Sequence, residues 1–140
     1  MSKKILVALD NSGYADKVML RAIELARLYK APLQGISVID DSYLGDDCCP
    51  YAVETRAYFT ISVQAVLDKC KDLAEKGDVD YSQEILNGNP AEEILKYAEQ
   101  KGVDLIVLGH LGKSAGAGFL IGSVAQKVAA YSKCSVYIVK

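Results

Sequence analysis

The sequence predicts a doubly wound α/β domain formed by residues 1–140, with a five-stranded parallel sheet and four helices. Five short apolar runs rich in β-branched residues alternate with four segments whose apolar residues recur every three or four positions. Each helix must return the chain to the same end of the sheet, so this alternation implies parallel strands with right-handed crossovers. A length of 140 residues, 51% of them hydrophobic and 24% charged, is also typical of one globular domain.

The predicted strands are short apolar runs, in chain order Ile5–Leu9, Leu33–Ile39, Tyr81–Leu86, Leu105–Leu108 and Ser135–Val139. The first and fourth are almost continuously apolar, which is expected of strands that helices cover on both faces. The last run contains no proline and no inward charge. We therefore expect it to form an edge strand that can pair with a second copy of the chain in a homodimer.

The predicted helices each place apolar residues on one face. These residues are Ala15, Val18, Ala22, Leu25, Ala26 and Tyr29 in the first helix, Phe59, Val63, Val66, Leu67, Cys70, Leu73 and Ala74 in the second, Ile94, Leu95 and Ala98 in the third, and Val124, Ala125, Val128, Ala129 and Ser132 in the last. Asn89, Pro90 and Glu92 predict the start of the third helix, as N-cap, first-turn proline and capping glutamate. Gly77 and Gly102 predict the ends of the second and third helices.

Composition argues against several classes of protein. The 16 basic and 18 acidic residues are scattered and give a net charge of −2, so no basic face for nucleic acid is expected. The apolar run after the N-terminus is too short for a signal peptide. No window approaches the roughly 18 apolar residues of a membrane span. We expect a cytoplasmic protein that contacts neither nucleic acid nor membrane.

The cysteines lack the spacing of metal ligands. Cys48 and Cys49 are adjacent, whereas zinc ligands usually stand two to four residues apart, and the single histidine, His110, is distant in sequence. Reduced structural cysteines are the simplest interpretation, and a redox-sensing pair at Cys48 and Cys49 is the alternative. Both residues lie in the segment from Asp40 to Tyr51, whose Asp, Gly and Pro content predicts a mobile surface loop.

A ligand site is expected at the carboxyl ends of the strands, where open parallel sheets bind ligands. Asp10, Asp40-Asp41 and Gly109 follow the first, second and fourth strands. The glycine-bearing stretch 109–123 leads into the last helix, whose free N–H groups, with Ser123, can donate to an anion. Lys113 could add a full charge. The stretch is neither a Walker A motif nor a dinucleotide fingerprint, and tight turns without a ligand remain an alternative role for its glycines.

The spacing Gly109-x-x-Gly112, nine residues, Gly122-Ser123 resembles the signature of the ATP-binding branch of the universal stress protein family. The opening Lys4–Asp10, the end of the second strand at Val38–Asp40 and the fourth strand Val103–Gly109 are similar to that family too. The resemblance extends from Lys4 to Lys140. It implies a Rossmann-like (adenine nucleotide alpha hydrolase-like) architecture that binds ATP with Mg²⁺.

The resemblance also implies a role for individual residues at the adenosine end. Asp10 would lie near the ribose or adenine, and the main chain of Val38 would contact the adenine edge. Ala8 would line the pocket, and Leu108 and Gly109 would border the nucleotide. A charged Asp10 suits the acceptance of ribose hydroxyl hydrogens. Stabilisation of the first helix's N-terminus together with Ser12 is an alternative or additional role.

At the phosphate end, the resemblance implies that Leu111 and Gly112 begin the phosphate loop. Gly122, Ser123 and Val124 would then hold the phosphates through backbone amides and the serine hydroxyl. His110 could serve as a general base, but a surface or hydrogen-bonding role is the simpler interpretation for a lone histidine in a glycine loop.

The resemblance implies a dimeric, nucleotide-dependent regulatory module of the stress response that an unknown protein partner recognises. The candidate residues supply neither a nucleophile–base pair nor a carboxylate dyad, so we expect ATP hydrolysis to be slow or absent. Two alternatives remain open. One is a slow ATPase or adenylyl-transferring enzyme, and the other is a dimeric scaffold without nucleotide. The sequence does not distinguish ATP from AMP.

Overall fold

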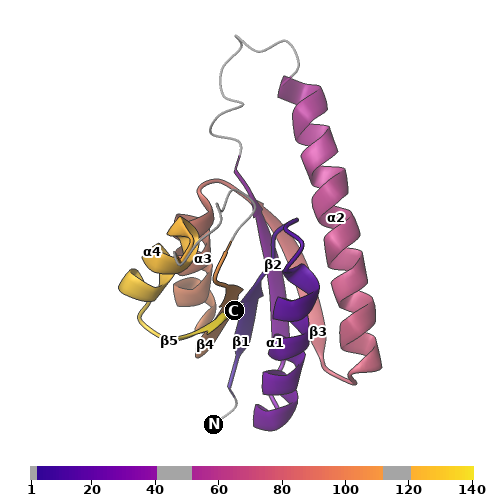
Figure 1. Ribbon diagram of the computed structural model, residues 1–140. Coiled ribbons are helices and arrows are strands. Elements are labelled where there is room, and N and C mark those ends of the chain that lie inside the picture. Colours follow the sequence, from indigo (N-terminus) through magenta and orange to yellow (C-terminus); the bar gives the residue numbers. More distant parts are fainter. Residues whose placement is uncertain (1–2, 41–51, 112–120) are drawn as a thin grey trace.

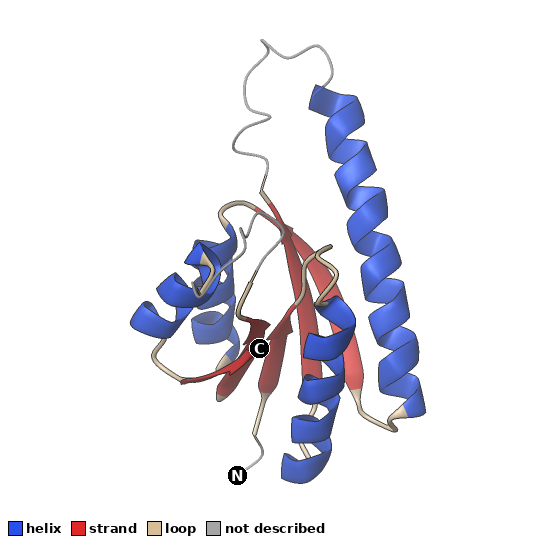
Figure 2. Cartoon of the chain, in the orientation of Figure 1, coloured by secondary structure: helices blue, strands red, loops and turns tan. Residues whose placement is uncertain are grey.

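The computed structural model describes residues 3–40, 52–111 and 121–140, and it confirms the predicted α/β fold. Strands and helices alternate along these residues (Figure 1), and Figure 2 shows the same elements by type. The elements are β1 (Ile5–Ala8), α1 (Ala15–Tyr29), β2 (Leu33–Ile39), α2 (Ala52–Lys76), β3 (Tyr81–Asn87), α3 (Pro90–Lys101), β4 (Leu105–Gly109), α4 (Ser123–Tyr131) and β5 (Ser135–Val139). All paired strands are parallel, in the order β3-β2-β1-β4-β5.

The sheet lies between two helical layers, α1 and α2 on one face and α3 and α4 on the other (Figure 1). Successive residues of a strand point to opposite faces. Accordingly Val7 packs in the core beneath α1 and α2, and Leu6 packs in the core beneath α3 and α4. Both side chains are fully buried. A sheet with two apolar faces requires this double cover, which is why β1 is apolar throughout.

The strand order confirms the predicted edge position of the last strand. β1 and β4 are neighbours at the centre, and the chain turns from one direction of winding to the other between them. β5 forms one edge of the sheet, and its residues alternate between exposed and more buried positions. The point between β1 and β4 is where a doubly wound sheet opens to a ligand.

Details at element ends differ from the prediction. Leu9 is buried but lies beyond the end of β1, and Tyr29 and Ala129, both near helix ends, are exposed. Met19 and Ile23 complete the buried face of α1. Apolar spacing therefore locates the helices well, but it overestimates burial near their ends, where the sheet no longer covers the helix.

The predicted start of α3 is confirmed. The side-chain oxygen of Asn89 accepts the main-chain N–H of Glu92 at 3.1 Å, and Pro90 is the first helical residue. Gly102 ends the helix with a φ of 66°, a left-handed conformation that glycine adopts without steric cost. Gly77 follows the last residue of α2, as predicted.

Two further predictions concern the membrane and the cysteines. Among the described residues, no helix has the length and hydropathy needed to cross a membrane. Cys70 is fully buried, and burial raises the pKa of its thiol to about 11; Cys134 is half-buried, and both are free thiols. Of the predicted loop from Asp40 to Tyr51, residues 41–51, with Cys48 and Cys49, lie outside the described residues.

Candidate functional site

A cavity of about 560 Å³ opens where β1, β2 and β4 end. The first residues of α1, α3 and α4 also border it, so three helix N-termini meet at this edge of the sheet. The volume lies within the roughly 300–1,000 Å³ typical of small-molecule sites. The fold therefore places a cavity of suitable size at the predicted position.

Every predicted site residue that the structure describes lines this cavity. These residues are Ala8, Asp10, Val38, Leu108, Gly109, Leu111, Gly122, Ser123 and Val124. Gly112, like Lys113, lies outside the described residues. Residues separated by more than 100 positions in sequence, such as Ala8 and Val124, thus line the same cavity.

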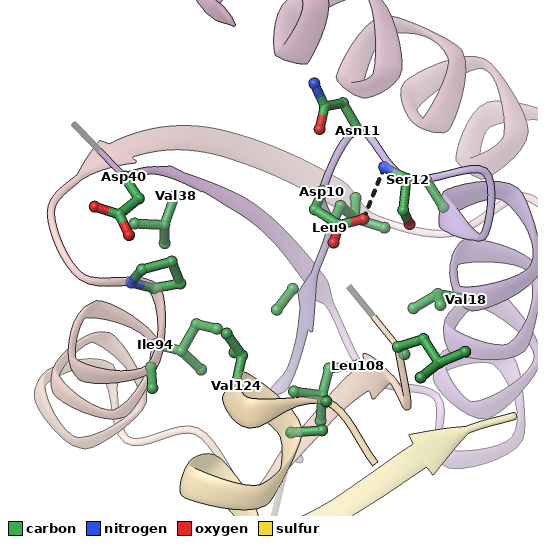
Figure 3. Close-up of a pocket in the computed structure, with 18 of the residues that line it drawn as sticks. Leu9, Asp10, Asn11, Ser12, Val18, Val38, Asp40, Ile94, Leu108 and Val124 are labelled. Atoms are coloured by element: carbon green, nitrogen blue, oxygen red, sulfur yellow. Dashed lines mark hydrogen bonds between the residues drawn. The ribbon is translucent and has the colours of Figure 1, made fainter. Parts of the chain in front are cut away.

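One side of the cavity is apolar. Val38 comes from β2, Ile94 from α3, Leu108 from β4 and Val124 from α4, and Figure 3 shows their side chains around the same space. Ala8 adds a small side chain at the end of β1. Apolar walls of this kind suit an aromatic ring, whose faces are excluded from water when it binds.

Asp10 lies in the same cavity and holds the loop after β1 in place. One oxygen of its carboxylate accepts the main-chain N–H of Ser12 at 3.0 Å (Figure 3), and the Ser12 hydroxyl oxygen accepts the N–H of Tyr14 at 3.3 Å. Both N–H groups precede α1, which starts at Ala15. Asp10 and Ser12 therefore order the approach to α1, whereas the helix itself has no side-chain cap at Tyr14.

Three features of the N-terminus of α4 leave it open to an anion, and one of them, the lack of an acidic residue in the first turn, distinguishes it from both α1 and α3. Its N-cap residue, Gly122, provides no side-chain cap, its first turn contains no acidic residue, and its first helical hydrogen bond is donated by the N–H of Gln126 to Gly122. The N–H groups of Ser123, Val124 and Ala125 therefore have no partner within the helix. We call these three N–H groups the α4 cradle.

The other two helix starts already have negative groups. Asp16 lies in the first turn of α1, and Glu92 and Glu93 lie in the first turn of α3. Asn89 occupies one N–H of α3, and Pro90 has none to offer. The carboxylates already interact with the positive ends of α1 and α3, so an anionic ligand would be stabilised less there than at the α4 cradle.

Sequence reasoning missed one charged residue of the cavity. Lys127 lines it together with Ser123, which stands four residues earlier on the same face of α4. Its ammonium lies 3.7 Å from a carboxylate oxygen of Glu92, and both side chains are largely exposed, so this ion pair contributes little stability. The spacing of four from Ser123 was the signal in the sequence that could have identified Lys127.

His110 lines the cavity but is held by contacts elsewhere. Its ring Nδ1 lies 3.2 Å from the main-chain oxygen of Val139, and its ring makes an edge-to-face contact with Tyr14 at 6.1 Å between centroids. These contacts agree with the hydrogen-bonding role and pair the imidazole with no nucleophile.

The described residues contain no group of three or more His, Cys, Asp or Glu side chains that could hold a metal ion. A Mg²⁺ ion that accompanies a nucleotide takes many of its ligands from phosphate oxygens and water, and needs only one or two carboxylates from the protein. The cavity has carboxylates at Asp10 and Asp40, at the ends of β1 and β2. With Asp10 expected at the ribose, Asp40 is the carboxylate that could contact a metal carried by the ligand, and the residues present fit that role.

The sequence model of the universal stress protein family (Usp) matches residues 1–140. The chain belongs to the universal stress protein family. Universal stress protein MJ0531 of Methanocaldococcus jannaschii is 34% identical over 139 residues, which make up 99% of this chain and 82% of that protein. Universal stress protein YxiE of Bacillus subtilis is 32% identical over 148 aligned positions that cover 100% of both proteins.

Solved structures of the family share the fold. Universal stress protein UspA from Lactobacillus plantarum superposes with a TM-score of 0.92 at 26% identity, covering 99% of this chain and 97% of that one. A universal stress protein solved in complex with cAMP has a TM-score of 0.73 at 25% identity, covering 99% and 96%. One from Archaeoglobus fulgidus, solved in complex with dAMP, has a TM-score of 0.74, covers 100% and 98%, and at 19% identity is alike in fold alone.

Proposed function

We propose that this universal stress protein binds an adenine nucleotide, ATP with Mg²⁺, and acts as a regulatory module in the stress response. The observation that carries the proposal is the α4 cradle. Its three residues line the cavity, and α4 has neither a side-chain cap nor an acidic residue in its first turn. Phosphate oxygens are the ligands that such a helix start favours.

The remaining walls support the adenosine part of the same ligand. The apolar side formed by Val38, Ile94 and Leu108 suits a purine ring, and Asp10 stands within the cavity as an acceptor for ribose hydroxyls. The family member solved with cAMP gives independent support, because cAMP is an adenine nucleotide. In this arrangement the nucleotide runs from the apolar side towards the start of α4.

The chemistry of the cavity favours binding over turnover. His110 donates its Nδ1–H to a main-chain oxygen, and Asp10 accepts a main-chain N–H. Neither side chain is paired with a nucleophile, and hydrolysis requires one that is activated. The protein then acts through its occupied and empty states, which an unknown protein partner distinguishes in the cytoplasm.

We include a homodimer formed through β5 in this proposal. β5 is an edge strand, and its central residue Tyr137 is 38% exposed. An edge without proline leaves main-chain groups available to a second copy, and a two-fold axis would pair the same strand with itself.

The test compares two glycine variants by calorimetric titration with ATP and Mg²⁺. Gly122→Val places a branched side chain at the N-cap of α4, next to the α4 cradle. We expect it to weaken ATP binding at least about tenfold, which is roughly 1.4 kcal/mol. Gly13→Val is the matched control, because a Cβ at Gly13 meets nothing within 4 Å. Equal affinities of both variants and the wild type would overturn the phosphate site. Steady ATP turnover by the purified wild type would favour the enzyme instead.

A further inference from the structure

His110 is the residue where the cavity meets the edge strand. It follows β4 directly and is partly buried. Its contacts reach the end of β5, the N-cap of α4 and the N-cap of α1. We propose that His110 is a positioning residue that couples the α4 cradle to the end of β5, so that occupancy of the cradle orders this end of the strand. The inference rests on the proposed nucleotide site.

The side chain of His110 adds a second donor to one carbonyl of β5. The main-chain N–H of His110 donates to the oxygen of Val139 at 2.9 Å, and Nδ1 lies 3.2 Å from the same oxygen. A carbonyl oxygen can only accept, so Nδ1 must carry the proton of this hydrogen bond. The edge-to-face contact with Tyr14 holds the ring in the orientation that this bond needs.

The main chain of His110 makes the connection to the cradle. Its carbonyl oxygen accepts the N–H of Gly122 at 2.6 Å, and Gly122 is the N-cap of α4. Val139 is therefore joined to the α4 cradle through His110 and Gly122. When an anion fixes the cradle, it also fixes Gly122, and the hydrogen bond to His110 transmits the restraint towards Val139.

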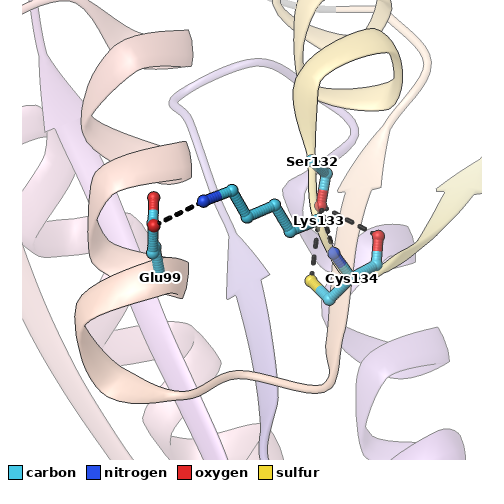
Figure 4. Close-up of polar contacts among 4 residues, drawn as sticks. All are labelled: Glu99, Ser132, Lys133 and Cys134. Atoms are coloured by element: carbon cyan, nitrogen blue, oxygen red, sulfur yellow. Dashed lines mark hydrogen bonds and ion pairs between the residues drawn. The ribbon is translucent and has the colours of Figure 1, made fainter.

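The other end of β5 is anchored independently of the cavity (Figure 4). In the turn before β5, the Ser132 hydroxyl oxygen accepts the N–H of Cys134 at 3.1 Å, and the ammonium of Lys133 lies 2.7 Å from a carboxylate oxygen of Glu99 on α3. None of these four residues lines the cavity. Coupling through His110 should therefore be strong at residues 137–139 and weak at Ser135.

This gradient along one strand can be measured by residue-resolved amide hydrogen exchange. The full chain is compared with and without saturating ATP and Mg²⁺, at a concentration where sedimentation shows one species. In the wild type, we expect ATP to slow exchange at residues 123–125 and, by about fivefold or more, at residues 137–139, a typical size for coupling between two sites. Exchange at Ser135 should change little.

Three variants separate the role of the His110 side chain from that of the fold. In His110→Ala, ATP should still slow exchange in the cradle but clearly less than in the wild type at residues 137–139, where only the main-chain hydrogen bond of residue 110 to Val139 remains. His110→Phe, which keeps a ring against Tyr14 without a donor, should behave in the same way and replaces the alanine variant if that one unfolds. His110→Asn carries an N–H donor close to the position of Nδ1 and should restore the effect on β5.

The outcomes distinguish this inference from the proposed function. Protection of the cradle without protection of residues 137–139 in the wild type would overturn the coupling and leave the nucleotide site standing. The same would follow if His110→Ala and His110→Phe protected β5 as the wild type does. If ATP protected no residue of the cradle in the wild type, the proposed function would fail, and the coupling with it.

Discussion

Lys127 is the lysine among the described residues that line the cavity. The acidic residues of the lining are Asp10 and Asp40. The partner of Lys127, Glu92, lies outside that lining and holds it weakly at 3.7 Å. An exposed ammonium with so weak a partner is available to a phosphate. The cavity therefore has one cationic side chain that can add to the α4 cradle, which is made of main-chain groups alone.

We expect Lys127→Ala to weaken ATP binding about three- to tenfold, because one partly exposed charge contact is worth roughly 1 kcal/mol. Glu92→Gln should strengthen it slightly, since Lys127 then loses its competing partner. Titration calorimetry with ATP and AMP measures both. Lys133→Ala is the control, as Lys133 pairs with Glu99 and lines no part of the cavity. An unchanged affinity in Lys127→Ala would exclude a contact between Lys127 and the phosphates.

Two weak acids in the core beneath α1 and α2, the fully buried Cys70 and the partly buried Tyr81, predict how stability depends on pH. Burial raises the pKa of the Cys70 thiol from its ordinary value of 9.0 to about 11, and burial likewise raises the pKa of the neighbouring Tyr81. The unfolded chain releases these protons at lower pH than the folded chain does. The free energy of unfolding should therefore fall as pH rises from about 9 to 11.

Urea unfolding at a series of pH values measures this loss. In Cys70→Ala the decline between pH 9 and 11 should be shallower, because one of the two titrating groups is gone, although the protein is less stable at every pH. A decline of the same slope in both proteins would assign the effect to other groups.

At the scale of elements, the sequence predicted which segments form strands and helices because apolar periodicity and capping residues are local signals. Asn89 and Pro90 marked the start of α3 correctly. Contacts between distant segments gave no such signal. The pairing of His110 with Val139, and the approach of Lys127 to Glu92, depend on the order of strands and the packing of α3 against α4. Residues of the cavity lining were predicted only where they belong to the motifs of the family resemblance.

The contrast between α3 and α4 gives a prediction at the same scale. Asn89→Ala removes the cap of α3 and should lower the free energy of unfolding by about 1 kcal/mol. ATP affinity should stay within about twofold, because α3 already has Glu92 and Glu93 in its first turn and is not the helix expected to hold the phosphates. Urea unfolding and calorimetry measure the two quantities. A large loss of affinity at unchanged stability would place the anion at α3 instead.

At the scale of the whole molecule, the proposed dimer depends on a single strand. Tyr137 is the middle residue of β5, so a two-fold axis that pairs β5 with itself brings Tyr137 next to its own copy. Tyr137→Glu would place two like charges side by side there, which destabilises strand pairing. We expect sedimentation velocity at micromolar concentration to show a dimer for the wild type and a monomer for Tyr137→Glu.

Tyr58→Glu is the matched control, because Tyr58 is 69% exposed on α2, on the opposite face of the sheet from α4 (Figure 1). A dimer that survives Tyr137→Glu but dissociates in Tyr58→Glu would move the interface from β5 to α2.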